Sequence, residues 1–492
     1  MTPSTPSASK MVVCVFDGLR PDFVTPERMP NLSGFAEGSS WFRQARSVFP
    51  SLTRPASASI ATGAPPRVHG VVGNSFLFPE VTREHILDLG SLDDILLAER
   101  HTEGRLVDTD TFADVLARNG RSMACVHSGS AGAAYVMNPR AARNGHWTFS
   151  IHGRDGSVTP EAVDEVVARF GPLPPRELPR FAEIDYAELV FREHVLERMR
   201  PDLALIWFNE PDTSFHYRFL GSDETASVVR AADAAFGRIL DWIDRQPDAE
   251  CYTVIAASDH GQITMTETLP LHELLRAAGH ENRQATERML TGAHIALTDG
   301  NMGEIRILQG GTARRDDIAN WLMEQDFLGM LFSCGGDGIE GEVPGTFPLS
   351  LVDLDHARAP DLIYVLRSHD GPDAWGHPGV GIVTAGDVPV GGGMHGGLHS
   401  DELNTVLIGR GAGFAAGTVD PRSCGIVDIA PTVLAALGLP PAAAMTGRSL
   451  LAAAGEAGSP VVHETGRGRF RQRLTSVERD RSRILLRGER VA

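Results

Sequence analysis

Two apolar runs that lie far apart in the chain each end in a carboxylate. The first, Val-Val-Cys-Val-Phe at 12–16, precedes Asp17, and the second, Thr-Val-Ile-Ala-Ala-Ser at 253–258, precedes Asp259 and His260. Such runs are typical of strands buried on both faces of a parallel sheet, and ligands bind at the carboxyl ends of those strands. A buried carboxylate loses its hydration unless a cation pairs with it. The pattern therefore predicts an α/β protein with a metal site.

Strands and helices are expected to alternate through the first half of the chain. Strand-like runs at 122–126, at 202–208 and up to Ala257 alternate with amphipathic stretches at 112–119, 186–199 and 225–245, and a further strand and helix follow at 404–408 and 427–438. This alternation predicts an α/β fold with a doubly wound, mainly parallel sheet sandwiched by helices.

The domain organisation follows from a break in this pattern. Residues 1–10 are expected to form a flexible N-terminus, and residues 11–265 and 391–455 the catalytic core. The stretch between His260 and His395 is too long for a simple connection. We therefore predict a smaller inserted α+β cap at 266–390, with expected strands at 303–308 and 361–366 and a helix at 316–324. The Arg-rich segment 456–492 is either solvated or forms a late strand at 484–486.

Charge and cysteine content exclude some classes of partner. A formal net charge of −18 argues against a nucleic-acid duplex, whose phosphates require basic residues. Bound metal ions would still permit a small anionic substrate. The five cysteines are scattered without CxxC spacing, so a disulfide framework is not expected. No apolar leader and no membrane-length run is visible, and we expect a soluble, cytoplasmic monomer or homodimer with no membrane partner.

Further potential metal ligands follow other predicted strands. Asp212 and His216 have i, i+4 spacing, which places them on one face of a helix, and His395 lies in Gly-Met-His-Gly-Gly. Together with Asp17, Asp259 and His260 they exceed what one tetrahedral site needs. Asp and neutral His are good Zn²⁺ ligands, and Mn²⁺ and Fe accept the same types. The set suits two divalent ions, with Zn²⁺ preferred.

In this order the motifs resemble the alkaline phosphatase superfamily, and within it the type I phosphodiesterase/nucleotide pyrophosphatase family, close to phosphonoacetate hydrolase. The resemblance covers roughly residues 11–262 and 391–440 and implies an alkaline phosphatase-like core. It also implies one ion held by Asp17, Asp259, His260 and the Thr53 oxygen, a second held by Asp212, His216 and His395, Thr53 as nucleophile, and Asn74 as hydrogen-bond donor to a phosphoryl oxygen.

This resemblance implies hydrolysis of phosphoric diesters or nucleotide pyrophosphate bonds through a phospho-Thr53 intermediate. A metal on the threonine oxygen favours the alkoxide, and two metals stabilise the entering and leaving oxygens. The alternatives are a phosphonoacetate hydrolase-like C–P bond hydrolase and a phosphomonoesterase of the same superfamily. The expected substrate is accordingly a small phosphorylated or phosphonate compound. A metal-binding scaffold without activity is disfavoured because neither the nucleophile nor any ligand is missing.

The phosphonoacetate hydrolase alternative depends on how a substrate carboxylate would be held. That family uses lysines after the strand that corresponds to 122–126, and residues 126–132 contain none. Arg140 and Arg143 are the candidates to replace them, because a guanidinium pairs well with a carboxylate. Arg54, beside the nucleophile, is a candidate for binding a non-bridging oxygen.

Several residue assignments stay open at this point. His399 is an alternative ligand to His395, although His395 matches the family motif better. Asn74 also fits an ordinary Gly-Asn-Ser turn, and the backbone N–H after Thr53 is a second expected donor to the phosphoryl group. Phe76 and Phe78 either stack on a base or aryl group of the substrate or belong to the core.

Three other polar residues lie near these motifs. His69 is expected to be structural. His377, in a Gly/Pro-rich loop, is expected to be solvated, and its alternative is a contact with substrate. Glu210 is either a support behind the ligands or a surface acid.

Overall fold

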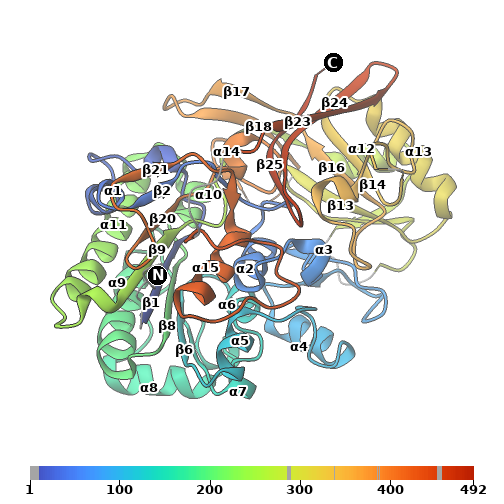
Figure 1. Ribbon diagram of the computed structural model, residues 1–492. Coiled ribbons are helices and arrows are strands. Elements are labelled where there is room, and N and C mark those ends of the chain that lie inside the picture. Colours follow the sequence, from blue (N-terminus) through green and yellow to red (C-terminus); the bar gives the residue numbers. More distant parts are fainter. Residues whose placement is uncertain are drawn as a thin grey trace.

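A mainly parallel sheet with helices on both faces forms the larger part of the molecule (Figure 1). The computed structural model describes residues 10–284, 290–336, 338–384, 386, 388–451 and 457–491. The eight strands, in spatial order, are β21 (Thr418–Asp420), β2 (Ser40–Phe42), β20 (Leu407–Arg410), β9 (Tyr252–Ala257), β1 (Lys10–Phe16), β8 (Leu203–Phe208), β6 (Met123–His127) and β7 (Trp147–Ser150). All pairs are parallel except those of β20 with β9 and β2. The expected fold class is confirmed.

Alternate residues of β1 point to two different cores, as the period of a strand requires. Val12, Cys14 and Phe16 belong to one buried cluster, and Met11, Val13 and Val15 belong to another. The helices of the first face are α1 (Pro30–Glu37), α8 (Pro160–Phe170), α9 (Phe181–Val190) and α11 (Asp223–Asp244), and those of the second are α2 (Thr53–Thr62), α5 (Phe112–Arg118) and α15 (Ile429–Ala436). Both faces of the sheet are therefore covered, which explains the continuous apolar runs.

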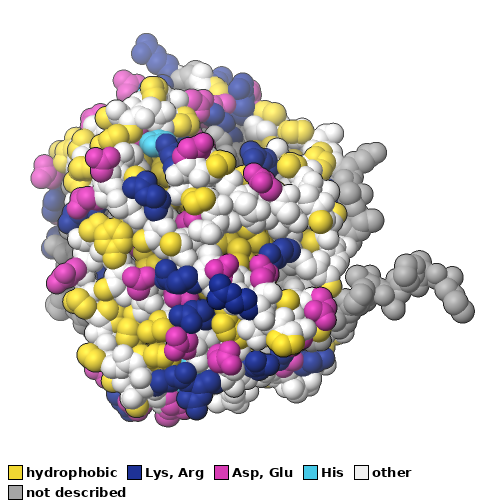
Figure 2. All heavy atoms as spheres, turned by 90° about the vertical axis from the view of Figure 1, so that its left-hand side faces the viewer, with side chains coloured by type: hydrophobic (Ala, Val, Ile, Leu, Met, Phe, Trp, Pro, Cys, Tyr) yellow, Lys and Arg dark blue, Asp and Glu magenta, His cyan; other side chains and the backbone are white. Residues whose placement is uncertain are grey.

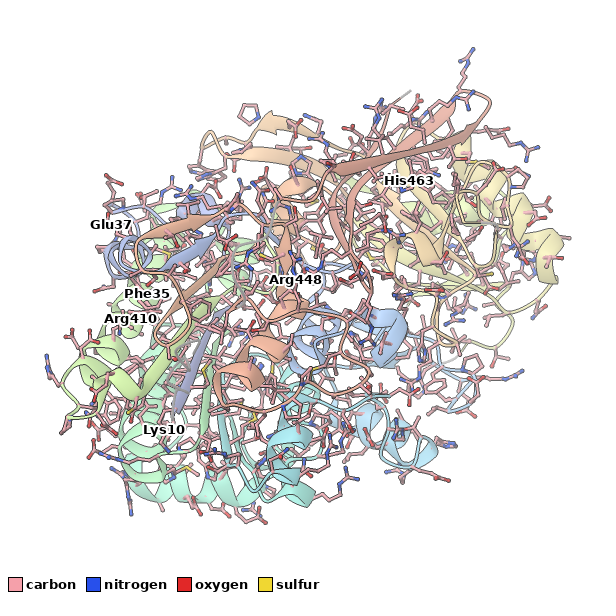
Figure 3. The ribbon with its side chains drawn as sticks, in the orientation of Figure 1. Lys10, Phe35, Glu37, Arg410, Arg448 and His463 are labelled. Carbon is pink, nitrogen blue, oxygen red and sulfur yellow. The ribbon has the colours of Figure 1, made fainter. Side chains whose placement is uncertain are left out.

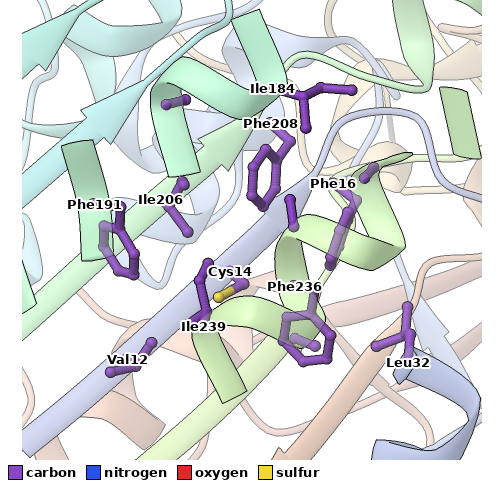
Figure 4. Packing of buried hydrophobic residues seen from close by; sticks show 14 of the residues in the cluster. Val12, Cys14, Phe16, Leu32, Ile184, Phe191, Ile206, Phe208, Phe236 and Ile239 are labelled. Carbon is purple, nitrogen blue, oxygen red and sulfur yellow. The ribbon is translucent and has the colours of Figure 1, made fainter. Parts of the chain in front are cut away.

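Aromatic rings pack among aliphatic side chains in the first of these cores (Figure 4). Phe16 stacks on Phe208 of β8 with ring centroids 5.4 Å apart, and it meets Phe236 of α11 edge-on at 5.7 Å. Helix α9 continues past Val190 as a π-helical segment through Met199, which accounts for the long stretch expected at 186–199. These contacts fix β1 and β8 side by side, and each strand leads directly into the site.

A second group of sheets lies at the opposite end of Figure 1. Its six-stranded sheet has the order β11 (Asn282–Gln284), β12 (Ile295–Leu297), β13 (Met302–Ile307), β16 (Leu362–Leu366), β14 (Leu328–Ser333) and β15 (Phe347–Pro348), with helices α12 (Leu271–Ala277) and α13 (Gly311–Met323). Helix α13 begins before the expected 316, because Gly310 at φ 93° turns the chain into it. The boundaries of a cap at 266 and 390 remain a prediction.

The C-terminal segment forms an antiparallel three-stranded sheet of β23 (Pro460–Arg467), β24 (Phe470–Glu478) and β25 (Arg483–Arg490). Of the two alternatives for this segment, the strand at 484–486 is therefore right and the solvated tail is wrong. Phe470, Gln472 and Leu474 alternate inward along β24. Burial of every second residue fixes which face of a strand packs on the core. In the sequence this alternation is hard to recognise, because arginines stand between the buried residues.

The chain leaves and re-enters the site region through paired strands. Strand β10 (Ile263–Leu269) follows His260 and pairs antiparallel with β19 (Gly393–Met394), which precedes His395. A four-stranded sheet joins them to β17 (Ser368–Pro372) and β18 (Pro378–Thr384). Residues distant in sequence are thus brought beside each other at one sheet edge.

Charged side chains of both signs lie on the surface. On the face shown in Figure 2, basic and acidic side chains are interspersed with neutral ones. Figure 3 places Arg410, at the end of β20, beside Phe35 of α1, with the guanidinium carbon 5.2 Å from the ring centroid. Among the described residues, no helix combines the length and the apolar character needed to cross a membrane.

Candidate active site

The predicted acidic residues meet at the carboxyl edge of the central sheet. Asp17 follows β1, Asp259 follows β9, and Asp212 begins helix α10 (Asp212–Arg218) just after β8. Because β9, β1 and β8 are neighbours in the sheet, their carboxyl ends converge despite the sequence distance between them. All three carboxylates are buried.

Two groups of side chains are close enough to hold a metal ion. Asp212, His216 and His395 form one group, and Asp17, Asp212 and His260 form the other, with the ligating atoms of each group within 4.8 Å of one another. The first group is the implied second site, whereas in the other group Asp212 stands where Asp259 was expected. Asp259 borders that group, since its Oδ2 lies 3.1 Å from His260 Nε2.

The three histidines are oriented by the backbone. Nδ1 of His216 donates to the carbonyl of Gly393 (2.6 Å), Nδ1 of His395 to that of Ser51 (2.8 Å) and Nδ1 of His260 to that of Gly261 (3.0 Å). Each Nε2 then faces a carboxylate: His216 and His395 face Asp212, and His260 faces Asp17. A ring whose Nδ1 donates to a carbonyl presents Nε2 as a metal ligand.

In Asp17 and Asp259, one carboxylate oxygen accepts a hydrogen bond from a neighbouring residue and the other oxygen is buried without one. Trp207 Nε1 donates to Asp17 Oδ2 at 3.0 Å, and the backbone N–H of Gly18 donates to Asp259 Oδ1 at 3.0 Å. Within the described residues, Asp17 Oδ1 and Asp259 Oδ2 have no hydrogen-bond partner. Gln262 Nε2 donates to Asp212. Buried oxygens of this kind are costly without a partner.

The electrostatics of this cluster favour a cation. Burial, followed by the negative charges of Asp259 and Asp212, raises the pKa of Asp17 well above its ordinary value. Burial and the neighbouring His260 lower the pKa of His395 well below its ordinary value, so this ring is neutral, and it stacks on His260 at 3.6 Å. Neutral imidazoles and clustered carboxylates with unpaired oxygens are the donor set that Zn²⁺ prefers. The residues therefore fit divalent metal ions.

Thr53 occupies the first position of helix α2 and faces this cluster. Its Oγ1 lies 3.3 Å from His260 Nε2, and the residue is 8% exposed. The partial positive charge at a helix N-terminus favours an anion there. The helix N-terminus can thus stabilise negative charge that develops on the threonine oxygen, and the same oxygen contacts the imidazole of His260.

Asn74 is anchored to the same helix. Its Oδ1 accepts from the backbone N–H of Arg54 at 3.0 Å, which leaves its Nδ2 as the donor on the side of a cavity of about 210 Å³ that Asn74 and His395 both line. A local turn therefore does not account for this side chain. The expected second donor, the N–H of Arg54, is already used by Asn74 and is not free for a phosphoryl oxygen.

The same cavity contains an unexpected acid. Glu304 of β13 is 4% exposed, and neither of its carboxyl oxygens has a hydrogen-bond partner in the part of the chain that the structure describes. Burial raises its pKa to about 8, although Arg306 opposes this shift. Nothing in the local sequence Met-Gly-Glu-Ile distinguishes Glu304 from an exposed strand residue.

The structure tests the expectations for three further histidines. His399 caps helix α14 (Ser400–Leu403) by accepting from Asp401 N, and its Nε2 lies 3.0 Å from Asp370, so both ring nitrogens are used away from the cluster. His69 is structural as expected, with its Nε2 2.9 Å from Ser59 Oγ. His377 is buried and stacks on Phe23, whose ring also meets Phe215 of α10, so the expectation of a solvated ring is wrong because the His377 ring packs on this aromatic pair.

The aromatic and acidic alternatives are also resolved. Phe76 and Phe78 belong to a buried hydrophobic cluster, which supports the core alternative and removes Phe76 as a stacking surface. Glu210 is buried and accepts from the N–H and hydroxyl of Ser214, so it supports α10 and is not a surface acid. Arg140 is paired with Asp114 at the start of α5.

Sequence reasoning missed two residues that orient the ligands. Trp207 lies inside the expected strand 202–208 and looks like any core aromatic, and Gln262 follows the Asp-His-Gly motif without a motif of its own. Their roles depend on which strand lies next to them: Trp207 reaches Asp17 across the β1–β8 pair, and Gln262 reaches Asp212 from the end of β9.

Comparison with known proteins places this arrangement in a family. A family model described as type I phosphodiesterase/nucleotide pyrophosphatase matches residues 11–318. The chain belongs to this family. The expected family is therefore confirmed. His395 lies beyond the matched residues, so its place beside Asp212 and His216 comes from the structure alone.

Curated relatives are similar only over short segments. The bis(5'-adenosyl)-triphosphatase ENPP4 of Homo sapiens is 32% identical over 84 residues, which are 17% of this chain and 18% of that protein. The mouse protein of the same name is 31% identical over 90 residues, 18% of this chain and 20% of the relative. The Xenopus laevis protein is 35% identical over 72 residues, which are 15% of this chain and 16% of the relative. The chain thus matches about a fifth of each relative's length.

Proposed function

We propose that this protein hydrolyses phosphoric diesters or nucleotide pyrophosphate bonds at a two-metal site, with Thr53 as the nucleophile. Membership of the family supports the class of reaction. The observation that carries the proposal is the position of Thr53 Oγ1, at the N-terminus of α2 and 3.3 Å from His260 Nε2 within the acidic cluster.

The residues would hold the two ions as two adjoining sets. One ion would be held by Asp17, Asp259, His260 and the Thr53 oxygen, and the other by Asp212, His216 and His395. This assignment is supported by the proximity of Asp17 and His260, and by the short distances from His260 Nε2 to Asp259 and to Thr53 Oγ1; Asp212 also adjoins the first set. Divalent ions bound there would lower the pKa of hydroxyl and water groups and neutralise charge on the reacting phosphoryl group. Zn²⁺ fits this set best, and Mn²⁺ and Fe are the alternatives.

The chain's own groups account for two half-reactions. In the first, the Thr53 oxygen forms a bond to phosphorus while the bond to the leaving alcohol or phosphate breaks. In the second, water attacks phosphorus and the Thr53 oxygen leaves. Asn74 Nδ2 is placed to donate to a phosphoryl oxygen on the cavity side, because its Oδ1 is fixed by Arg54 N. Loss of one such donor typically costs on the order of 10²–10³ in rate.

The test is the hydrolysis of bis-p-nitrophenyl phosphate and of a bis(5'-adenosyl) triphosphate by the wild-type protein and by Thr53→Ala and Thr53→Ser. We expect Thr53→Ala to lose about 10³-fold or more in kcat, because the covalent route is removed. Thr53→Ser should keep measurable activity. Mass spectrometry of rapidly quenched wild-type protein should detect phosphate on Thr53. Unchanged turnover by Thr53→Ala would refute the role of the nucleophile.

A further inference from the structure

A group of basic side chains adjoins the acidic cluster on the same edge of the central sheet. His127 ends β6, His152 follows β7, Arg54 is the second residue of α2, and Arg180 immediately precedes α9. Strands β6 and β7 follow β8 in the sheet order, so their carboxyl ends continue the row that begins with Asp259 and Asp17. The edge thus changes from acidic to basic beyond β8.

Trp207 connects the two regions directly. Its Nε1 donates to Asp17, and its ring stacks on His127 with centroids 5.0 Å apart and planes inclined by 14°. On the far side, Arg176 Nη1 lies 3.0 Å from His152 Nδ1. The indole ring of Trp207 is therefore all that separates His127 from Asp17, a proposed metal ligand.

These side chains carry buried donors that have no acceptor. Gly129 N donates to His127 Nδ1 and Arg176 donates to His152 Nδ1, so the ring hydrogen of each neutral imidazole is on Nε2. Neither Nε2 has a partner in the described parts of the chain, and the same holds for Nε of Arg54 and of Arg180. Buried donors are rarely left without an acceptor in native proteins.

The arginines differ in how far their charge is compensated. Arg180 pairs with Glu183 at 2.5 Å, and Arg176 lies 3.7 Å from the same carboxylate. Arg54 makes no side-chain hydrogen bond or ion pair with any other described residue, and the charges nearest to it are those of Asp88, Asp17 and Asp212. Burial and the positive charge of Arg176 lower the pKa of His152 to about 4, with further contributions from Arg180 and Arg54, and the backbone of Gly129 opposes this shift. The His152 ring is therefore neutral, and the positive charge that an oxyanion would balance comes from the arginines.

We infer that Arg54, His127, His152 and Arg180 form a subsite beside Thr53 that binds a second oxyanion of the substrate. The proposal rests on the proposed function and specifies its substrate class. The substrate carries a carboxylate or a further phosphate next to the phosphorus that Thr53 attacks. A guanidinium binds either group through paired N–H donors, and the imidazole N–H groups add neutral donors. An uncharged aryl or nucleoside group would leave these donors unsatisfied.

The experiment compares ligands that differ only in the second charge. Phosphonoacetate is compared with its carboxyl methyl ester, and pyrophosphate with inorganic phosphate, as inhibitors of bis-p-nitrophenyl phosphate hydrolysis at a fixed free metal concentration. We expect the charged member of at least one pair to bind about tenfold or more tightly in the wild type, the usual effect of one charge-assisted hydrogen bond. The pair that shows the preference tells carboxylate from phosphate.

Arg54→Gln is the main variant. The Arg54 guanidinium forms no ion pair with a described residue, so its removal leaves no carboxylate without its partner. The ratio of the affinities for the charged and the uncharged or less charged ligand of a pair should fall towards one in Arg54→Gln. The same is expected in the double variant Arg180→Gln/Glu183→Gln, which removes both partners of that ion pair. Arg245→Gln, at a surface position where the side chain is 78% exposed, should retain it. A wild type without any preference, or one unchanged in both variants, would overturn the subsite.

A separate readout distinguishes this inference from the proposed function. The same ligand pairs are used in thermal-shift titrations of the metal-loaded protein, which need no turnover. Absence of diester hydrolysis together with a charge preference in the thermal shift would refute the proposed function and keep the subsite. Diester hydrolysis without a charge preference in either assay would keep the proposed function and refute the subsite.

Discussion

At the scale of single residues, the site depends on side chains that were placed by neighbouring strands and not by local motifs. The cluster of Asp and His residues could be predicted from the sequence because several of them follow predicted strands whose carboxyl ends converge, and the resemblance to the family grouped them into two sets of proposed metal ligands. Trp207, Gln262 and Glu304 could not, because each looks like an ordinary strand or loop residue until its neighbour across the sheet is known. The same holds for Arg54, whose lack of a partner is a property of the fold.

Glu304 leads to a prediction about pH. Its pKa of about 8 in the folded protein exceeds that of an exposed glutamate, so its protonated form is favoured by folding. The resulting stabilisation is fully present below the unfolded-state pKa of roughly 4.5 and is lost as the pH rises through about 8. Glu304→Gln should remove this loss, and its melting temperature should exceed that of the wild type at pH 8.5 but not at pH 5.

The comparison is made by thermal unfolding between pH 5 and pH 9. Each pKa unit corresponds to about 1.4 kcal/mol, so the difference in unfolding free energy should reach a few kcal/mol at the upper end. Glu250→Gln, at an exposed position, should follow the wild-type curve. Parallel curves for wild type and Glu304→Gln would contradict the shifted pKa.

At the scale of elements, the C-terminal sheet is tied to the catalytic core by one buried ion pair. Arg479, between β24 and β25, donates Nη1 to Asp428 Oδ2 at 2.8 Å and Nη2 to Asp428 Oδ1 at 2.6 Å. Asp428 is fully buried and precedes α15. The carboxylate also accepts from the backbone of Gly425 and Arg448, so it fixes the loops around that helix.

Removing the arginine should therefore destabilise more than the tail. Arg479→Ala would leave the Asp428 charge buried without its partner, which typically costs about 3–5 kcal/mol. We expect that loss in urea unfolding monitored by circular dichroism. Arg469→Ala, at an exposed position in the turn between β23 and β24, should change stability by less than about 0.5 kcal/mol. Equal effects of the two substitutions would show that the ion pair contributes little.

Elements were predictable where hydrophobic periodicity was strong. Strands β1, β6, β8 and β9 and helix α11 lie within a few residues of where the pattern predicts them. Of the C-terminal strands, only β25 was anticipated, as the alternative at 484–486, because arginines occupy many of the solvent-facing positions there. Strand β18 was missed because a proline and two glycines interrupt it, and β10 was missed because Thr and Glu replace apolar residues in its second half. Tertiary pairing, not local preference, decides the structure of such segments.

At the scale of the whole molecule, negative charge is concentrated where three buried carboxylates meet. The unpaired oxygens of Asp17 and Asp259 make that region costly to bury, and cations bound there would offset this cost. A chelator should therefore lower the melting temperature by about 5 °C or more, and readdition of Zn²⁺ should restore it. The shift is measured by calorimetry alongside metal analysis of the purified protein.

Asp259→Asn serves as the comparison for this effect. It removes one of the charges that the ions offset, so the loss of melting temperature on chelation should be smaller than in the wild type. The distant Asp241→Asn, on an exposed face of α11, should behave as the wild type does. A melting temperature that does not respond to chelation would mean that the cluster folds without metal.

The pairing of β10 with β19 has a consequence for how this protein can diverge. The two strands bring His260 and His395 together. The chain between these histidines therefore leaves the acidic cluster along β10 and returns to it along β19. Outside these two strands and the residues beside them, we expect insertions, deletions and substitutions in that interval to leave both histidines in place, while Glu304 and its surroundings in the cavity wall vary. Selection could then change which molecule the cavity accepts without moving the acidic cluster.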